Sequence, residues 1–298
     1  MTLSSLIARL PGGVAIGILY GIMALGIYIT FRVLKVSDLT VDGSFATGGA
    51  VSIMLMLNGV NPYVSLICAF AVGLLCGTVT GLLHTKLNIP IILSSILVQI
   101  GLYSVNLRIM QGSALKSISV DKFPLLINVR YVNRTILIGA LISLILIAVL
   151  YWYFGTEQGS SIRATGNNSA MAKSNGISTA TTTLIGLALC NGLVAFAGAL
   201  MSQYQGFADV NQGRGAIVTG LAAIIIGEVL CDIFFSRQSS FWLRLTFVIL
   251  GGVIYYLIMV LILWMRVDSN DLKLFTAIIV AIFLAIPNFR KGAADSHA

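Results

Sequence analysis

Charged side chains are scarce in this sequence of 298 residues. Only 9% of the residues are Asp, Glu, Lys or Arg, which amounts to 10 acidic and 18 basic residues. A soluble domain carries roughly 25% charged residues. So few charges cannot build a water-facing surface for a chain of this length, and this excludes a soluble enzyme, a nucleic-acid-binding protein and a disordered chain.

Residues that bind metals or perform catalysis are also few. The chain has 4 cysteines and 2 histidines, and no two cysteines are separated by two residues. This spacing supports neither a zinc site nor a disulfide framework. The sequence also lacks the patterns HExxH, GxSxG and GxxxxGK[ST]. We therefore expect no catalytic residue, no metal and no ATP-binding phosphate loop in this chain.

Long apolar blocks dominate what is present: 58% of the residues are hydrophobic, and the mean hydropathy is +0.98. Because about 20 apolar residues in a helix cross the bilayer core, the blocks predict an all-α polytopic membrane protein with about nine transmembrane helices. The block after Arg9 is too long for a signal-peptide core, so we interpret it as the first crossing. No room is left for a soluble domain, and we expect a single transmembrane domain over 1–298. The predicted crossings are 13–31, 39–57, 63–83, 89–107, 135–154, 180–203, 214–232, 242–265 and 273–288.

Three of these crossings carry a small residue at every fourth position. Residues four apart lie on one face of a helix, so each stripe lets another backbone come close. The pattern predicts a tightly packed bundle and is uninformative about function. The stripes are Gly13, Gly17 and Gly21; Ser44, Gly48 and Ser52; and Gly73, Gly77 and Gly81.

Two long polar connections, 108–134 and 155–179, join the apolar blocks. Placing 155–179 in the cytoplasm leaves nine basic residues on each side, so the positive-inside rule does not fix the orientation. We expect 108–134 to be extracytoplasmic, the N-terminus outside and the C-terminus inside. Within the second connection, 168–175 is typical of a short helix that ends at Gly176. It is either a docking element for a cytoplasmic partner or an ordinary loop.

Polar residues at membrane depth are the default candidates for function, and each is alternatively a hydrogen bonder between helices. Asp38 is able to cap the helix that starts near Leu39, and Asp42 falls in its first turn, where the helix dipole favours negative charge. Glu228 is either an interhelical or gating residue or a solvated end residue. With so few intramembrane carboxylates, a proton relay is disfavoured. The candidates for a translocation pathway are Asp38, Asp42, Gln99, Asn106, Asn191 and Glu228.

The second connection also carries a resemblance to a known family. The run Gly159-x3-Arg163-Ala164-x5-Ala170-x5-Gly176-Ile177 resembles the cytoplasmic coupling segment of permease subunits of bacterial ABC importers. The most similar set is the branched-chain amino acid permease superfamily, which also holds ribose-type sugar permeases. Stretches 17–26, 36–44 and 191–200 resemble further family segments in the same order.

Within that superfamily, 38–44 and 203–209 are most similar to a subgroup linked to tryptophan and tyrosine uptake. Two departures from the branched-chain pattern argue against a leucine-type substrate. No histidine occurs at Ser37-Asp38, and Glu228 stands where many relatives have small residues.

The resemblance implies an ABC importer permease fold with a short cytoplasmic coupling helix within 155–179, located in the lipid of the bacterial inner membrane. It implies a second permease copy, as a homodimer, an extracytoplasmic substrate-binding protein and a cytoplasmic ATPase dimer that binds ATP and Mg. The resemblance implies that the solute is an amino acid, and the similarity to the tryptophan and tyrosine subgroup favours an aromatic one. By the resemblance, the ATPase-coupling residues are Arg163, Ala164, Gly166, Asn167, Ala170, Met171 and Gly176.

Two alternatives stay open from the sequence. One keeps the same permease class but carries a sugar or nucleoside. The other is an autonomous channel or secondary transporter, which would have no need of the polar segment 159–176.

Overall fold

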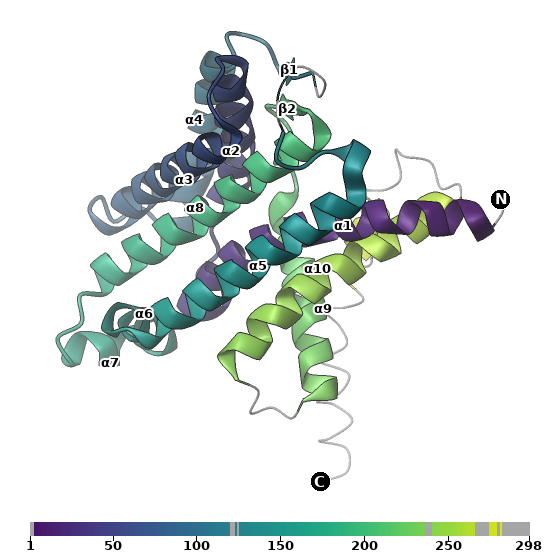
Figure 1. Cartoon of the computed structure of the whole chain (residues 1–298). Helices are drawn as coiled ribbons and strands as arrows, with labels where there is room; N and C mark the ends of the chain where they lie inside the picture. Colours follow the sequence, from purple (N-terminus) through teal and green to yellow (C-terminus); the bar gives the residue numbers. More distant parts are fainter. Residues whose placement is uncertain are drawn as a thin grey trace.

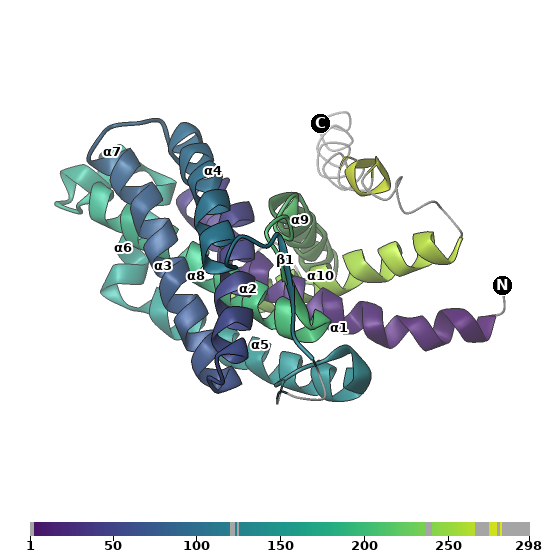
Figure 2. The same ribbon diagram turned by 90° about the horizontal axis from the view of Figure 1, so that it is seen from above.

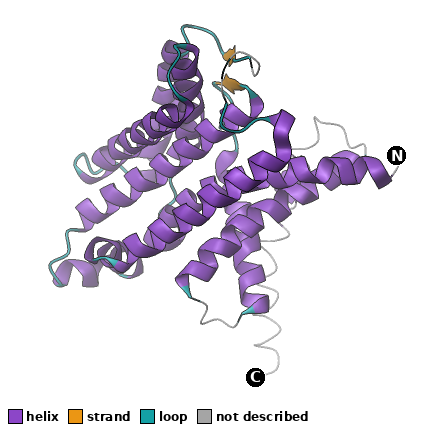
Figure 3. Ribbon diagram, in the orientation of Figure 1, coloured by secondary structure: helices purple, strands orange, loops and turns teal. Residues whose placement is uncertain are grey.

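The computed structural model describes residues 3–119, 123, 125–235, 240–265, 274–278 and 281. Helices make up most of this part of the chain (Figure 3). Eight of the helical segments in the described residues are long and apolar enough to cross a membrane, which confirms the all-α polytopic class. They are α1 (Leu3–Tyr28) with its continuation η1 (Ile29–Leu34), α2 (Thr40–Leu57), α3 (Pro62–Thr85), α4 (Ile91–Ile109), α5 (Val132–Gly155), α8 (Thr179–Gln205), α9 (Ala216–Phe234) and α10 (Phe241–Trp264).

Helix α1 begins at Leu3, ten residues before the predicted start at 13. The other described helices begin and end within a few residues of the predicted crossings, because local signals mark them. α3 starts with Pro62 after Asn61, whose side chain accepts a hydrogen bond from the Tyr63 amide at 3.0 Å. This is the preferred chemistry of a helix N-terminus. α8 ends at Gly206, which adopts the left-handed conformation with φ +76°. The predicted crossing at 273–288 lies mostly outside the described residues.

Helix α8 packs directly against α2 and α3, while α1 and α10 lie side by side (Figures 1 and 2). The small-residue stripes form these contacts. Gly73 of α3 meets the backbone of Asn191, and Gly48 of α2 meets that of Ala195. Gly17 of α1 lies on α10 in the same way. A side chain at any of these glycines would collide with backbone, so the predicted close packing of the bundle is confirmed.

Short elements lie at the two ends of the bundle (Figure 1). At one end are α6 (Glu157–Asn167) and α7 (Ser169–Ser174), so the connection predicted to hold one short helix holds two. At the other end, β1 (Leu115–Ser117) pairs with β2 (Phe207–Asp209) in antiparallel fashion. The long connection before α5 also contains a 3₁₀ turn, η2 (Val129–Tyr131).

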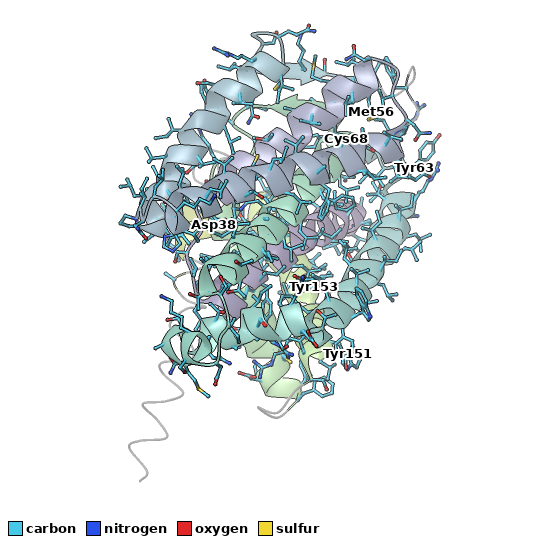
Figure 4. The ribbon with its side chains drawn as sticks, turned by 90° about the vertical axis from the view of Figure 1, so that its left-hand side faces the viewer. Asp38, Met56, Tyr63, Cys68, Tyr151 and Tyr153 are labelled. Carbon is cyan, nitrogen blue, oxygen red and sulfur yellow. The ribbon has the colours of Figure 1, made fainter. Side chains whose placement is uncertain are left out.

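The end of the first crossing is irregular. The last six residues of the segment, η1, form a π-helix, and Lys35 after it has a positive φ of 58°. Such π-helical turns are rare and frequently mark functional sites. The chain then re-enters the bundle, and α2 runs from beside Asp38 to Met56, close to Tyr63 at the start of α3 (Figure 4).

Candidate functional site

A buried polar network joins the re-entry before α2 to the middle of α8. The Nδ2 group of Asn191 donates to Asp38 Oδ2 at 2.6 Å and to the Leu187 carbonyl at 2.9 Å. Its Oδ1 accepts from the Ser44 hydroxyl at 2.6 Å. Asp38 and Asn191 are fully buried, so their geometry is that of interhelical hydrogen bonders. Asp38 Oδ1 also accepts from the Thr40 amide, which is the capping role expected for it.

Asp42 has a partner that its place in the sequence does not reveal. Its two carboxylate oxygens accept from the backbone amides of Gly215 and Ile217 at 3.0 and 2.9 Å. These amides belong to the first turn of α9, where amide groups lack helical partners and the helix dipole is positive. Gly213 lies so close to the Asp42 carbonyl that no side chain fits there. Asp42 therefore fixes the start of α9 against α2.

A cavity of about 350 Å³ lies beside this contact, between α2, α4 and the segment that links β2 to α9. It brings together three predicted pathway residues, Asp42, Gln99 and Asn106. Asn106 is 1% exposed, and its Oδ1 has no hydrogen-bond partner among the described residues. A buried acceptor without a partner is costly, so a donor that reached this oxygen would remove that cost. The lining residues are Asp42, Gly43, Gln99, Ile100, Tyr103, Ser104, Asn106, Val210 and Arg214.

Three polar lining residues were missed by sequence reasoning: Tyr103, Ser104 and Arg214. A signal for the first existed, because Gln99, Tyr103 and Asn106 are spaced i, i+4, i+7 and so share one helix face. Arg214 stands directly before an apolar block, where the sequence indicates only a charged residue at the end of a crossing. Its approach to α4 depends on the fold of the segment before α9, which has no local signature.

Glu228 of α9 forms an ion pair with Arg32 of η1. The Arg32 side chain is 49% exposed and that of Glu228 is 13% exposed. Tyr28, Cys231, Asp232 and Arg244 complete the lining of a small cavity of about 250 Å³ at this site. The geometry agrees with the interhelical interpretation of Glu228. Since η1 also contacts α6, the pair lies at the α6–α7 end of the bundle.

Helix α6 is seated on η1. Gly166 meets the carbonyl of Val33 so closely that an added Cβ would clash with it, and Ala164 is half-buried on the same helix. The Lys35 ammonium donates to Asn167 Oδ1 at 3.3 Å. On another face, the hydroxyls of Thr165 and Thr182 are 2.8 Å apart, which ties α6 to α8. Gly166 therefore makes a contact within the chain.

Helix α7 and its surroundings face outward. Arg163, Ala170 and Met171 are exposed, and Met171 is 62% exposed. Gly176 follows α7 in the left-handed conformation, with φ +81°. The amides of Gly176 and Ile177 donate to the carbonyls of Lys173 and Ala172, which is a Schellman motif. The predicted end of the short helix at Gly176 is correct. At the end of α5, Tyr151 and Tyr153 lie near α6 (Figure 4).

Within the described residues, no three His, Cys, Asp or Glu side chains are grouped to hold a metal ion. A bundle of membrane-spanning helices, with polar groups around a cavity and an exposed helix pair at one end, is typical of membrane transport proteins. The chain belongs to the family described as branched-chain amino acid transport system / permease component, whose model matches residues 10–287. The resemblance to an ABC importer permease is confirmed at this level.

Comparison with curated proteins gives relatives along nearly the whole chain. The chain is 38% identical over 281 residues to a tyrosine transport system permease protein of Clostridioides difficile, covering 94% of this chain and 92% of the relative. It is 32% identical to the uncharacterized protein RP368 of Rickettsia prowazekii, covering 88% and 92%. The autoinducer 2 import system permease protein LsrC of Yersinia pseudotuberculosis is 27% identical over 63% of this chain and 53% of its own length. No solved structure matches the chain.

Proposed function

We infer that this chain is the membrane-spanning subunit of an ABC importer in a bacterial cytoplasmic membrane, and that its solute is an amino acid with an aromatic side chain. Family membership supports the permease role. The relative named as a tyrosine transport permease supports the choice of solute. The observation that carries the proposal is the exposed α6–α7 pair, which packs on η1 at one end of the bundle.

The α6–α7 pair is suited to bind a separate ATPase. Ala172 anchors α7 because its side chain is buried, whereas Ala170, Met171 and Lys173 face outward. An exposed methionine is typical of an adaptable binding surface. The ATPase would supply ATP and Mg binding, and the permease would present α7 and the Arg163 region to it from the cytoplasmic side.

Contacts inside the chain connect this surface to the bundle. Gly166 of α6 rests on Val33 of η1. Arg32, one residue before Val33, pairs with Glu228 of α9. A packed contact of this kind moves as a unit and does not deform gradually. A displacement of α6 by the ATPase therefore shifts η1, and η1 carries the shift to α9.

The exposed side of α4 supports a second permease copy. Tyr103 and Ser104 are exposed on this helix, and Gln99 is half-buried. Lipid disfavours exposed polar groups at membrane depth. A second copy facing α4 across a water-filled pathway provides a polar environment for them. In this arrangement the extracytoplasmic binding protein delivers solute at the β1–β2 end, and the single domain spans 1–298.

Reconstitution tests the proposal. The permease and its ATPase are reconstituted in proteoliposomes together with the binding protein, and ATP is supplied on the side of the membrane where the ATPase lies. Uptake of labelled L-tyrosine, L-tryptophan, L-leucine and D-ribose is then measured. We expect ATP-dependent uptake of tyrosine or tryptophan. A nonhydrolysable nucleotide serves as the control. Uptake of ribose alone would reject the amino acid, and uptake that continues without ATP would reject the ABC class.

A further inference from the structure

The cavity between α2, α4 and the start of α9 holds opposite charges that do not neutralise each other. Asp42 and Arg214 both line it. Among the described residues, the ion pair closer than 4.0 Å joins Arg32 to Glu228, and Asp42 and Arg214 form none. Arg214 is exposed just before α9 begins, and Asp42 is half-buried, so a ligand that carries the complementary pair of charges is able to reach both groups.

The backbone holds the two charges beside each other. Gly213 packs on the Asp42 carbonyl, and Gly215 donates its amide to Asp42 Oδ2. Arg214 stands between these two glycines, so its Cα is fixed next to Asp42. Each carboxylate oxygen accepts one of the two α9 amides and retains a second acceptor position. Asp42 is therefore able to bind a cation while it caps α9.

The neutral groups around the cavity complete the set of donors and acceptors. Asn106 Oδ1 is buried and lacks a partner in the described part of the chain. Gln99 offers an amide from the same face of α4, and Ser104 offers a hydroxyl. The ring of Tyr103 presents an apolar surface to the same space. The volume, about 350 Å³, falls within the range of about 300–1,000 Å³ that is usual for small-molecule sites.

We propose that this cavity binds a free α-amino acid in its zwitterionic form, a substrate site inside the permease itself. The Arg214 guanidinium takes the carboxylate, because its planar fork matches two carboxylate oxygens. Asp42 accepts from the α-ammonium group, which has three hydrogens to donate, and Asn106 Oδ1 accepts another of them once its side chain turns toward the cavity. The Tyr103 ring packs against the side chain, where an aromatic group gains most.

This inference rests on the proposed function, since it places the transported amino acid at a particular point in the pathway. The two charged groups of the cavity also favour an amino acid over a neutral sugar as the ligand. A sugar would leave both Asp42 and Arg214 without a charged partner, whereas a zwitterion satisfies both at once.

The experiment measures binding of labelled L-tyrosine to the permease–ATPase complex in lipid nanodiscs, without the binding protein. Two analogues compete: tyramine, which lacks the carboxylate, and 3-(4-hydroxyphenyl)propionate, which lacks the ammonium group. We expect saturable tyrosine binding and weaker competition by each analogue, by about tenfold, as the loss of one charged hydrogen-bond partner predicts.

Three variants sharpen the measurement. Arg214→Gln removes the charge and is expected to weaken tyrosine binding about tenfold while leaving tyramine binding unchanged. Arg214→Lys keeps the positive charge but lacks the planar guanidinium group, so its affinity for tyrosine is expected to lie between that of Arg214→Gln and that of the unmodified protein. Arg108→Gln, an exposed arginine at the end of α4, is the matched control and is expected to bind like the unmodified protein.

Three outcomes would contradict the proposal that this cavity binds the amino acid. They are equal binding of tyrosine and tyramine, an Arg214→Gln complex that binds tyrosine normally, and a complex that transports tyrosine with no saturable binding in the millimolar range. A folding defect in Arg214→Gln is recognised by its elution profile, and the analogue competition on the unmodified complex then decides. Failure of the proposed function looks different, since no amino acid would then be taken up by the unmodified reconstituted system.

Discussion

Asn191 in the middle of α8 donates a 2.6 Å hydrogen bond to Asp38, which precedes it by 153 residues. Replacing Asn191 with alanine leaves the buried Asp38 Oδ2 and the Ser44 hydroxyl without this partner. We expect Asn191→Ala to lower the free energy of unfolding by about 1–3 kcal/mol, the cost of stranded buried polar groups. Thermal unfolding in detergent measures this. Asn58→Ala, at an exposed asparagine after α2, is the control. Equal melting temperatures for the two variants would show that the Asn191 network is energetically neutral.

Gly77 tests the close packing of α3 on α8. A Cβ at this position would meet the backbone at Leu187 and Ala188, whereas one at Gly101 of α4 meets nothing within 4 Å. Overpacking costs about 1–3 kcal/mol, and alanine in an open helical position gains up to about 1 kcal/mol over glycine. We therefore expect Gly77→Ala to lower the melting temperature in detergent and Gly101→Ala to leave it unchanged or raise it. A destabilised Gly101→Ala with a normal Gly77→Ala would contradict the packing described.

The positions of the crossings were predictable because a helix that spans a bilayer needs a long apolar block, and each block is marked by polar ends. The stripes of small residues were equally legible, since Gly73 and Gly77 lie on one face at a spacing of four. These features are local. They depend on the helix period and on the lipid environment, and not on which distant segment supplies the partner.

The role of Asp42 shows where the sequence ceases to inform. Its position predicts a favourable charge in the first turn of α2, yet it caps α9, whose amides are 173 and 175 residues further along.

The sequence does not predict helix α6, for a different reason. Its residues 157–167 are polar and contain two glycines, so it lacks an apolar period, and packing on η1 and α8 stabilises it instead. The π-helical turn η1 likewise has no local signature in its sequence.

The Arg32–Glu228 ion pair predicts a measurable coupling between η1 and α9. Arg32→Gln and Glu228→Gln each remove one partner, and the double variant removes both. If the pair carries motion from η1 to α9, the effects of the single changes on ATP-driven uptake are not additive, with an interaction energy of about 0.5–3 kcal/mol. A double-mutant cycle on uptake rates in proteoliposomes gives this number. Arg108→Gln combined with Glu228→Gln is the control pair, because Arg108 is exposed at the end of α4 and lies outside the contacts that join α6, η1 and α9. Additive effects for Arg32 and Glu228 would show that the pair is a solvated surface contact.

Gly166 provides the sharpest test of how α6 transmits the action of the ATPase. Its backbone touches the Val33 carbonyl of η1, whereas Gly155, near the same end of the bundle, has nothing within 4 Å of an added Cβ. Gly166→Ala forces α6 away from η1, and an overpacking penalty of about 1–3 kcal/mol on the coupled state slows uptake about tenfold or more.

Because Gly166 faces η1 and not the ATPase, the variant should still bind the ATPase, and co-purification of the complex checks this. ATP hydrolysis by the complex should then continue without stimulation by the loaded binding protein. Gly155→Ala should transport and hydrolyse normally. If Gly166→Ala lost the ATPase altogether, Gly166 would belong to the docking surface, and the route through η1 would be wrong.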